Sequence, residues 1–250
     1  MPLERLVEIM RRLRDPVNGC EWDTVQTFET IAPYTIEEAY EVADAIARKD
    51  TEALADELGD LQLQVVFHAE MAEEAGLFDL NGVIERICDK MERRHPHIFG
   101  DAEHGGHHLW EKIKADERAA SPDKSALAGV ALALPALERA AKLQRRAARV
   151  GFDWPDASGP RAKIDEELGE LDAETDHQRK LEELGDLLFA VVNLARHLNI
   201  EPEAALRDAN YKFEQRFRVI EQTPGFEHLP LDEKEELWAV AKKAQADSSA

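Results

Sequence analysis

Cysteine, glycine, proline and aromatic residues are all scarce in this chain. Its 250 residues include only 2 cysteines, Cys20 and Cys88, so no disulfide framework is expected, which is typical of a reducing cytosol. The most apolar stretch, residues 126–137, is short and interrupted by Pro135, and the N-terminal segment lacks the apolar core of a signal peptide. We therefore expect a cytoplasmic protein that does not insert into a membrane.

Basic residues are also in deficit. Lysine and arginine number 31 against 52 aspartates and glutamates, which gives a formal net charge of −21. A surface of this charge repels nucleic-acid backbones and anionic membranes, so neither is expected as a partner. An anionic small ligand would need local cations. Apolar residues make up 44% of the chain, which is enough for hydrophobic cores, and 250 residues can hold two modest domains.

Helical periodicity covers most of the chain, and no run of alternating β-branched residues predicts a strand. Glycine and proline, at 13 and 11 residues, interrupt this periodicity rarely. We therefore predict an all-α fold. The expected helices span residues 3–14, 35–48, 51–75, 80–94, 108–118, 136–148, 160–175, 178–197, 202–221 and 232–245.

One acidic pattern occurs twice. Each copy gives Glu-Glu-x-x-Glu and then Glu-Leu-Gly-Asp at the start of an apolar run. We call each set of four acids a quartet. The first quartet consists of Glu38, Glu41, Glu57 and Asp60, and the second of Glu167, Glu170, Glu183 and Asp186. The two acids of each pair are three residues apart and share one face of a helix, so two packed helices would bring four carboxylates together.

Four clustered negative charges need a bound cation, and oxygen ligands suit Mg²⁺ or Mn²⁺. Acidic pairs also arise by chance, because Asp and Glu make up 52 of the 250 residues, and a charged helix face is usually only a solvated face. Two features favour the metal site. The quartet recurs in the same order, and Glu57 and Asp60 lie beside an apolar stripe, where unpaired acids are costly.

The similarity between the halves extends beyond the quartets. A loop with adjacent Trp and Asp precedes each quartet, and a Lys-x-x-x-Arg pair follows it. The order of motifs is kept while the loop lengths differ, which indicates an internal duplication rather than a short solenoid repeat. We predict two tandem helical-bundle domains, residues 1–120 and 135–250, joined by a linker at 121–134, since the stretch 117–129 is small, polar and contains proline.

Several cationic and aromatic residues near the second quartet are candidates for ligand binding. Lys212 and Arg216 lie one helical turn apart and suit phosphate oxygens, as do Lys90 and Arg94 in the first half, although such pairs are often ordinary surface charge. Aromatic faces stack on bases, but a tryptophan is more often a core or loop anchor. The further candidates are Lys163, Lys180 and Trp238.

Two asparagines distinguish the second half from the first. Counted from the last quartet acid, Asn193 matches Phe67. Counted back from the lysine of the Lys-x-x-x-Arg pair, Asn210 matches Cys88. The second half therefore keeps polar groups where the first is apolar or nearly so, and both asparagines join the candidates for nucleotide binding.

At this level of detail the chain resembles the MazG family, tandem-domain nucleoside triphosphate pyrophosphohydrolases of the all-α NTP pyrophosphatase superfamily. The resemblance spans nearly the whole chain. In the first half, Glu21 stands where the family's entry loop usually has proline. The matching segments are MRRLRDPVNGCEWDTVQTF, IAPYTIEEAYEV, ELGDLQLQVVF, RRHPHIF, GFDW, ELGDLLFAVVNLARHL and NYKFEQRF.

The resemblance implies Mg²⁺-dependent hydrolysis of nucleoside triphosphates to a monophosphate and pyrophosphate, in nucleotide-pool housekeeping, by a homodimer. It maps the family's acidic motif onto both quartets. It also implies that the second domain is catalytic, through Glu167, Glu170, Glu183 and Asp186, and that the first is weakly active or inactive. The alternative is a non-catalytic helical module whose quartets bind metal or nucleotide to regulate a partner protein.

Overall fold

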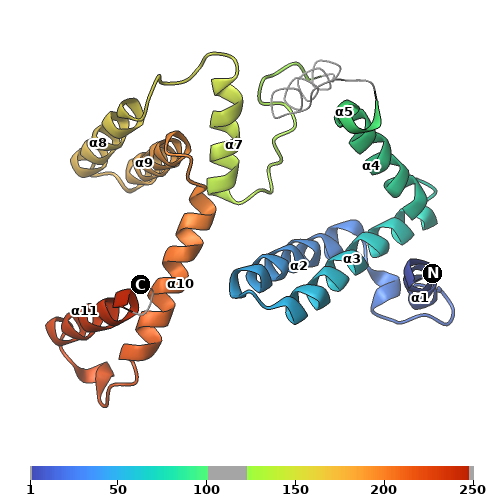
Figure 1. The fold of residues 1–250 in the computed structure, drawn as a ribbon, viewed down its shortest axis with the longest axis horizontal. Coiled ribbons are helices and arrows are strands. Elements are labelled where there is room, and N and C mark those ends of the chain that lie inside the picture. The colour runs from blue at the N-terminus through green and yellow to red at the C-terminus, as the bar shows by residue number, and fades with distance from the viewer. Residues whose placement is uncertain (1, 101–122, 248–250) are drawn as a thin grey trace. The chain divides into compact units, whose positions relative to one another are not determined.

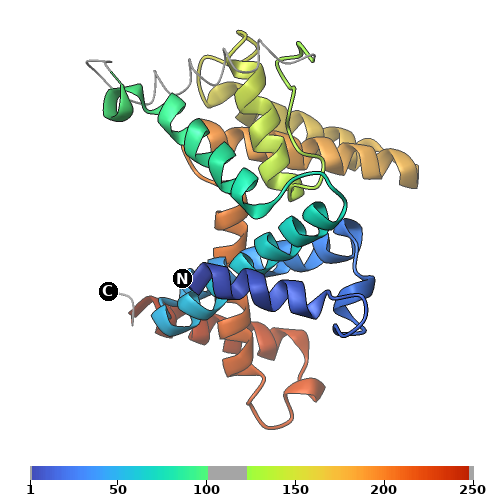
Figure 2. The same ribbon diagram turned by 90° about the vertical axis from the view of Figure 1, so that its right-hand side faces the viewer.

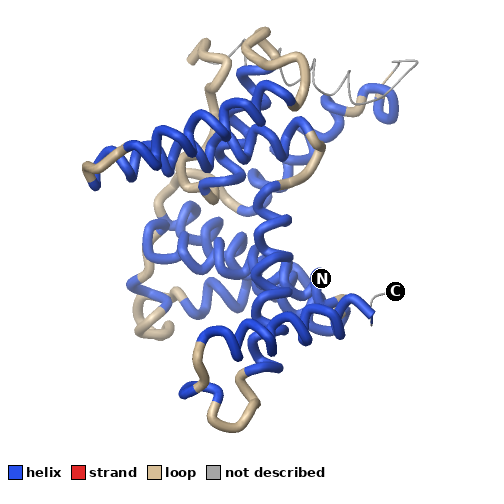
Figure 3. Tube along the Cα trace, turned by 90° about the vertical axis from the view of Figure 1, so that its left-hand side faces the viewer, coloured by secondary structure: helices blue, strands red, loops and turns tan. Residues whose placement is uncertain are grey.

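The computed structural model describes residues 2–100 and 123–247, and every regular element in these ranges is a helix (Figures 1 and 3). The predicted all-α fold is confirmed. The chain divides into two compact units, Met1–Glu117 and Arg118–Ala250. The helix expected at 108–118 and the start of the proposed linker lie outside the described residues. Within the described ranges, no helix is long and apolar enough to cross a membrane.

The first unit is built on a helical hairpin. α2 (Phe28–Arg48) and α3 (Thr51–Glu74) pack against each other along their length. The chain reverses between them because Lys49 adopts a left-handed conformation with φ 56° and Asp50 caps α3 by accepting from the Ala53 amide. α1 (Pro2–Leu13) lies against α3, as Figure 2 shows. A short 3₁₀ helix (Asp23–Val25), α4 (Leu80–Arg94) and α5 (Pro96–Phe99) complete the unit.

α2 begins seven residues before the predicted start at residue 35. Thr27 and Thr30 form a reciprocal capping box, and Pro33 is accommodated inside the helix. Pro33 lies in the second turn, where it lacks the amide that would otherwise donate to the Glu29 carbonyl oxygen, so the helix starts at Phe28 despite this local cost. The short α5 was not predicted. Met10, Ile31, Val66, Phe67 and Met71 form the core between these helices.

The second unit repeats the hairpin. α8 (Ser158–Ala173) and α9 (His177–His197) pack along each other, and α7 (Ala136–Ala148) lies against α9 (Figure 1). Asp176 caps α9 by accepting from the Arg179 amide. α10 (Pro202–Ile220) contacts α7 and α9, and α11 (Leu231–Asp247), after a 3₁₀ turn at Phe226–His228, packs on α10. These bounds agree with the predicted ones to within about two residues.

Candidate active site

Each hairpin gathers three acids of its quartet. Carboxylate oxygens of Glu38, Glu41 and Glu57 lie within 4.8 Å of one another, where α2 faces α3. In the second unit, Glu167 and Glu170 of α8 meet Glu183 of α9 in the same way. The predicted pairing of two helix faces therefore holds for three acids of each quartet.

The fourth acid of each quartet lies outside this close group but still acts on it. The pKa of Glu38 is raised, mainly because the side chain is partly shielded from water and secondly because of the negative charge of Asp60. Loss of hydration, followed by the charges of Glu170 and Glu167 and then of Asp186, raises the pKa of Glu183. Both clusters therefore hold their negative charge against mutual repulsion, and a cation between the oxygens would relieve it.

The residues of the second cluster fit a divalent cation. Glu167 is 4% exposed, and its Oε2 is buried with no hydrogen-bond partner in the described part of the chain. Lys163 Nζ approaches the Glu167 carboxylate to 2.6 Å at Oε1. A buried, unpaired carboxylate oxygen is costly without a ligand. An all-oxygen donor set of this kind suits Mg²⁺ or Mn²⁺.

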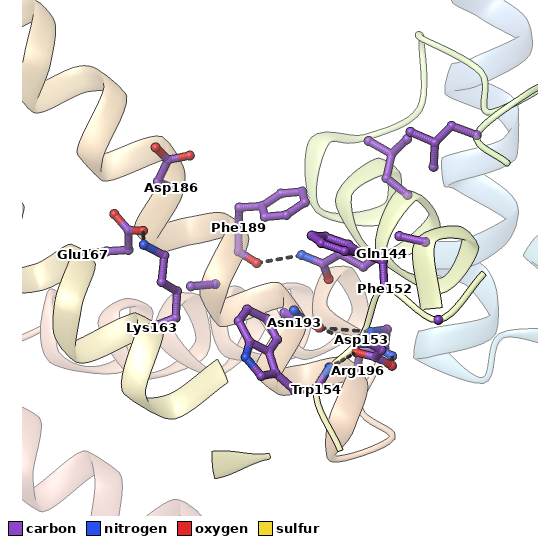
Figure 4. Close-up of a pocket in the computed structure, with 15 residues that line it drawn as sticks. Gln144, Phe152, Asp153, Trp154, Lys163, Glu167, Asp186, Phe189, Asn193 and Arg196 are labelled. Atoms are coloured by element: carbon purple, nitrogen blue, oxygen red, sulfur yellow. Dashed lines mark hydrogen bonds and ion pairs between the residues drawn. The ribbon is translucent and has the colours of Figure 1, made fainter. Parts of the chain in front are cut away.

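A cavity of about 610 Å³ adjoins the second cluster within the same unit (Figure 4). Phe152, Trp154 and Phe189 give it aromatic walls. Gln144 and Asn193 add two amide groups, and Lys163, Glu167 and Asp186 line it as well. One cavity thus joins the acidic cluster to an aromatic and amide-lined space, in a size range typical of sites for small ligands.

An ion-pair network fastens the loop between α7 and α8 to α9. Arg196 donates both to the Asp153 carboxylate and to Asn193 Oδ1, and the His197 ring lies 3.1 Å from Asp153. The hydrogen bond from Arg196 lowers the pKa of Asp153. This network fixes the position of Trp154, the next residue, at the cavity wall. Sequence reasoning noted the loop and Asn193 but missed Gln144, Phe152, Asp153 and Arg196.

The predicted nucleotide-binding residues fall into two groups. Lys163 and Asn193 line the cavity, whereas the other five candidates do not. Arg216 donates to Gln245 and lies 5.7 Å from the centre of the Trp238 ring, so both belong to a cluster between α10 and α11. The candidates that do not line this cavity are Lys180, Asn210, Lys212, Arg216 and Trp238.

Comparisons with known proteins agree with the geometry. A family model described as the MazG nucleotide pyrophosphohydrolase domain matches residues 26–99. The chain is 51% identical to the nucleoside triphosphate pyrophosphohydrolase of Escherichia coli K12, over 98% of both chains. It is 46% identical to the nucleoside triphosphate pyrophosphohydrolase/pyrophosphatase MazG of Thermotoga maritima, over 96% of this chain and 95% of that protein.

Proposed function

This chain belongs to the MazG family, and from that premise we propose that its second unit carries out Mg²⁺-dependent hydrolysis of nucleoside triphosphates. The protein is a nucleoside triphosphate pyrophosphohydrolase and acts in nucleotide-pool housekeeping. The observation that carries the assignment to the second unit is the buried, unpaired Glu167 oxygen, set among three carboxylates beside Lys163 at a cavity.

Each residue of the second cluster has a proposed role. Glu167, Glu170 and Glu183 would hold the cation. A bound Mg²⁺ neutralises phosphate oxygens and lowers the pKa of a coordinated water. Asp186, which lies outside the close group but lines the cavity, is free to orient or deprotonate the attacking water. Lys163 is paired with Glu167 and takes up phosphate charge when the triphosphate enters.

The first unit is proposed to be weakly active or inactive, although it retains an acidic cluster. Aligned on the quartets, Tyr34 stands where the second half has Lys163. The Tyr34 ring meets the Trp22 ring edge-on at 6.0 Å. A phenol can donate a hydrogen bond to phosphate, but it supplies no positive charge to offset the phosphate charge. The first cluster therefore lacks the lysine that lies against the second, although the charge of Arg48 still acts on Glu57.

A homodimer is the proposed assembly. Large apolar side chains of α10 and α11 remain exposed, and water contact on this scale is unfavourable for a helix face. A second copy of the chain would cover them, as expected for a helical hairpin that lacks further bundle helices. The exposed side chains on these helices include Leu206, Tyr211, Phe213, Phe217, Val219 and Val240.

Pyrophosphate release from a mixed pool of nucleoside triphosphates tests the proposal. We expect turnover with Mg²⁺ or Mn²⁺ and none after EDTA. Glu170→Gln should remove most of the turnover, and its matched control Glu41→Gln, at the corresponding place in the first cluster, should cost far less. Full turnover in metal-free buffer would contradict the role of the carboxylates, and a dominant effect of Glu41→Gln would place the active site in the first unit.

A further inference from the structure

The first acid of each cluster has a different partner in the two units. In the second unit, the Lys163 ammonium group lies 2.6 Å from the Glu167 carboxylate. In the first unit, Gln64 of α3 takes up this role, and its Nε2 donates to Glu38 Oε1 at 3.4 Å. One carboxylate is therefore held against a positive charge, and the other only against a neutral amide.

The sequence of each half excludes the arrangement of the other. Counted from the last quartet acid, Gln64 matches Ala190, which has no hydrogen-bonding side chain. Counted from the first quartet acid, Lys163 matches Tyr34, whose ring packs edge-on against Trp22. The contrast between the clusters is thus set by two differences in residue type and not by side-chain conformation.

Gln64 is a buried polar residue whose hydrogen bonding is incomplete. It is 8% exposed, and its Oε1 is buried without a hydrogen-bond partner in the described part of the chain. A buried amide that is only half satisfied costs free energy. Its one side-chain hydrogen bond is directed at Glu38. A hydrogen bond of this kind, made from outside the ligand set, orients a carboxylate that binds a metal ion.

In the described ranges, no lysine or arginine forms an ion pair with an acid of the first cluster. Arg48 lies on the same helix as two of these acids, but it pairs with Asp44 at 2.7 Å and with Asp50 at 3.1 Å. Loss of hydration and then the charges of neighbouring acids raise the pKa of Glu57, and the charge of Arg48 offsets only part of this rise. The three converging carboxylates therefore keep most of their charge for a bound ion.

We propose that the first cluster is a nucleotide-independent site for a divalent cation, in which Gln64 orients Glu38 as a ligand. A Mg²⁺ or Mn²⁺ ion without nucleotide meets three carboxylates that no ammonium group neutralises, whereas at the second cluster it competes with Lys163. A triphosphate that enters the second unit draws this lysine to its own oxygens, so cation and nucleotide bind there together. The statement about the second unit rests on the proposed function, and the statement about the first does not.

Mn²⁺ binding to the whole chain, followed by electron paramagnetic resonance, tests the proposal. Without nucleotide, the wild-type protein should bind one Mn²⁺ roughly tenfold or more tightly than any other. Glu41→Gln should abolish this tight site, and Glu170→Gln, its match in the second cluster, should leave it intact. Addition of α,β-methylene-ATP should create a further tight site in the wild-type protein and in Glu41→Gln, but not in Glu170→Gln. A nucleotide-free tight site that survives Glu41→Gln, or that is lost in Glu170→Gln, would overturn the proposal.

Gln64→Met tests the role of the amide, because it removes both polar atoms at similar size. Nucleotide-free Mn²⁺ affinity should fall by roughly 10- to 100-fold, the range for groups that orient metal ligands. Thermal unfolding in EDTA separates this role from core packing, since a residue that only fills the core changes the Tm and leaves the Mn²⁺ affinity alone. Wild-type Mn²⁺ affinity in a folded Gln64→Met protein would contradict the assignment of Gln64.

Tyr34→Lys installs the ammonium group of the second unit at the matching position of the first. Nucleotide-free Mn²⁺ binding should weaken by roughly tenfold or more, because the lysine lies one helical turn from Glu38 and competes for its charge. Tyr34→Met removes the phenol without adding charge and should bind Mn²⁺ as the wild-type protein does. Equal affinities in the two variants would contradict the importance of the missing lysine. Pyrophosphate release by the wild-type protein tests the hydrolase function separately, so failure of either proposal can be told from failure of the other.

Discussion

Glu183 shows that stability and activity oppose each other within the acidic cluster. Loss of hydration and the charges of Glu170 and Glu167 raise its pKa, which means that its charged form is disfavoured while no cation is present. The fold therefore tolerates repulsion at a place where a cation is needed. Such local cost is typical of functional sites.

Glu183→Gln should separate the two effects. In EDTA the variant should have a higher Tm than the wild-type protein, because one repelling charge is gone. With Mg²⁺ this advantage should shrink or reverse, and turnover should fall by roughly 100-fold, the scale of losing one electrostatic contribution to the transition state, because the cation is held less well. Thermal unfolding measures the Tm in EDTA and with Mg²⁺, and pyrophosphate release measures turnover. A variant that is equally active and no more stable would show that Glu183 is only surface charge.

Asp153 has the opposite electrostatic character, because a hydrogen bond from Arg196 lowers its pKa. A folded-state pKa below the unfolded value of about 3.9 means that the pair stabilises the fold above that pH. The stabilisation is lost as the pH falls through the folded-state pKa. Asp153→Asn should thus cost roughly 1–2 kcal/mol near neutral pH, at or below the lower end for charged hydrogen bonds because solvent partly screens this pair.

The free-energy difference between Asp153→Asn and the wild-type protein should narrow progressively below pH 4. Urea unfolding at neutral pH and at several acidic values measures it. Asp156→Asn on the same loop measures the local contribution, because Asp156 accepts hydrogen bonds from Ser158 and interacts with α9 only through the charge of His197. A constant difference across the whole pH range would mean that the charge of Asp153 contributes nothing to stability.

At the scale of helices, periodicity predicted most of the fold. The bounds of α4 and α7 were predicted to the residue, since apolar spacing, caps and glycine or proline boundaries agree there. The start of α2 was missed: the helix was predicted from residue 35, whereas the Thr27 capping box begins it at Phe28, with Pro33 inside the helix. Local sequence signals conflicted at that point, and the cap prevailed.

The site was predicted less completely than the helices. The quartets were visible because their spacing places acids on one helix face. Gln144 was missed because one glutamine in an amphipathic helix gives no signal until its place against Phe189 and the cavity is known. Lys212 and Arg216 share a helix face, but spacing within α10 cannot specify which surface that helix faces.

The helix caps offer a matched test of how the hairpins position their acids. Asp50 caps α3 and Asp176 caps α9, each by accepting from the amide three residues later. Replacing either by alanine should cost about 1 kcal/mol in the free energy of unfolding. Only Asp176→Ala should also weaken Mg²⁺-dependent turnover, because α9 carries Glu183 two turns beyond the cap.

Urea unfolding and pyrophosphate release of the two cap variants check this prediction. Equal losses of activity in Asp50→Ala and Asp176→Ala would mean that the first unit contributes to turnover as much as the second. That result would count against the proposal that the second unit is catalytic and the first is weakly active or inactive.

At the scale of the whole molecule, a chain of net charge −21 must bind a polyanionic substrate. Divalent cations and a few local basic side chains have to overcome that field. Lys163 meets this need at the cavity, whereas Lys212 and Arg216 do not line it. The apolar side chains exposed on α10 and α11 belong to the same helices as Arg216 and Trp238. A second copy that covers this face would bring those residues against another chain.

Mixed dimers can establish whether Arg216 acts on the partner's site. Glu170→Gln removes a proposed cation ligand, and Arg216→Ala removes a proposed phosphate contact, so each variant alone should lose most turnover. If Arg216 serves the site of the partner subunit, a heterodimer of the two variants contains one intact site, made from Glu170 of one chain and Arg216 of the other. Differentially tagged, purified heterodimers should then regain about half of the wild-type rate, and both parent homodimers should remain inactive. Absence of any recovery would place Arg216 at the site of its own chain, and light scattering of the wild-type protein at a mass of one chain would contradict the dimer itself.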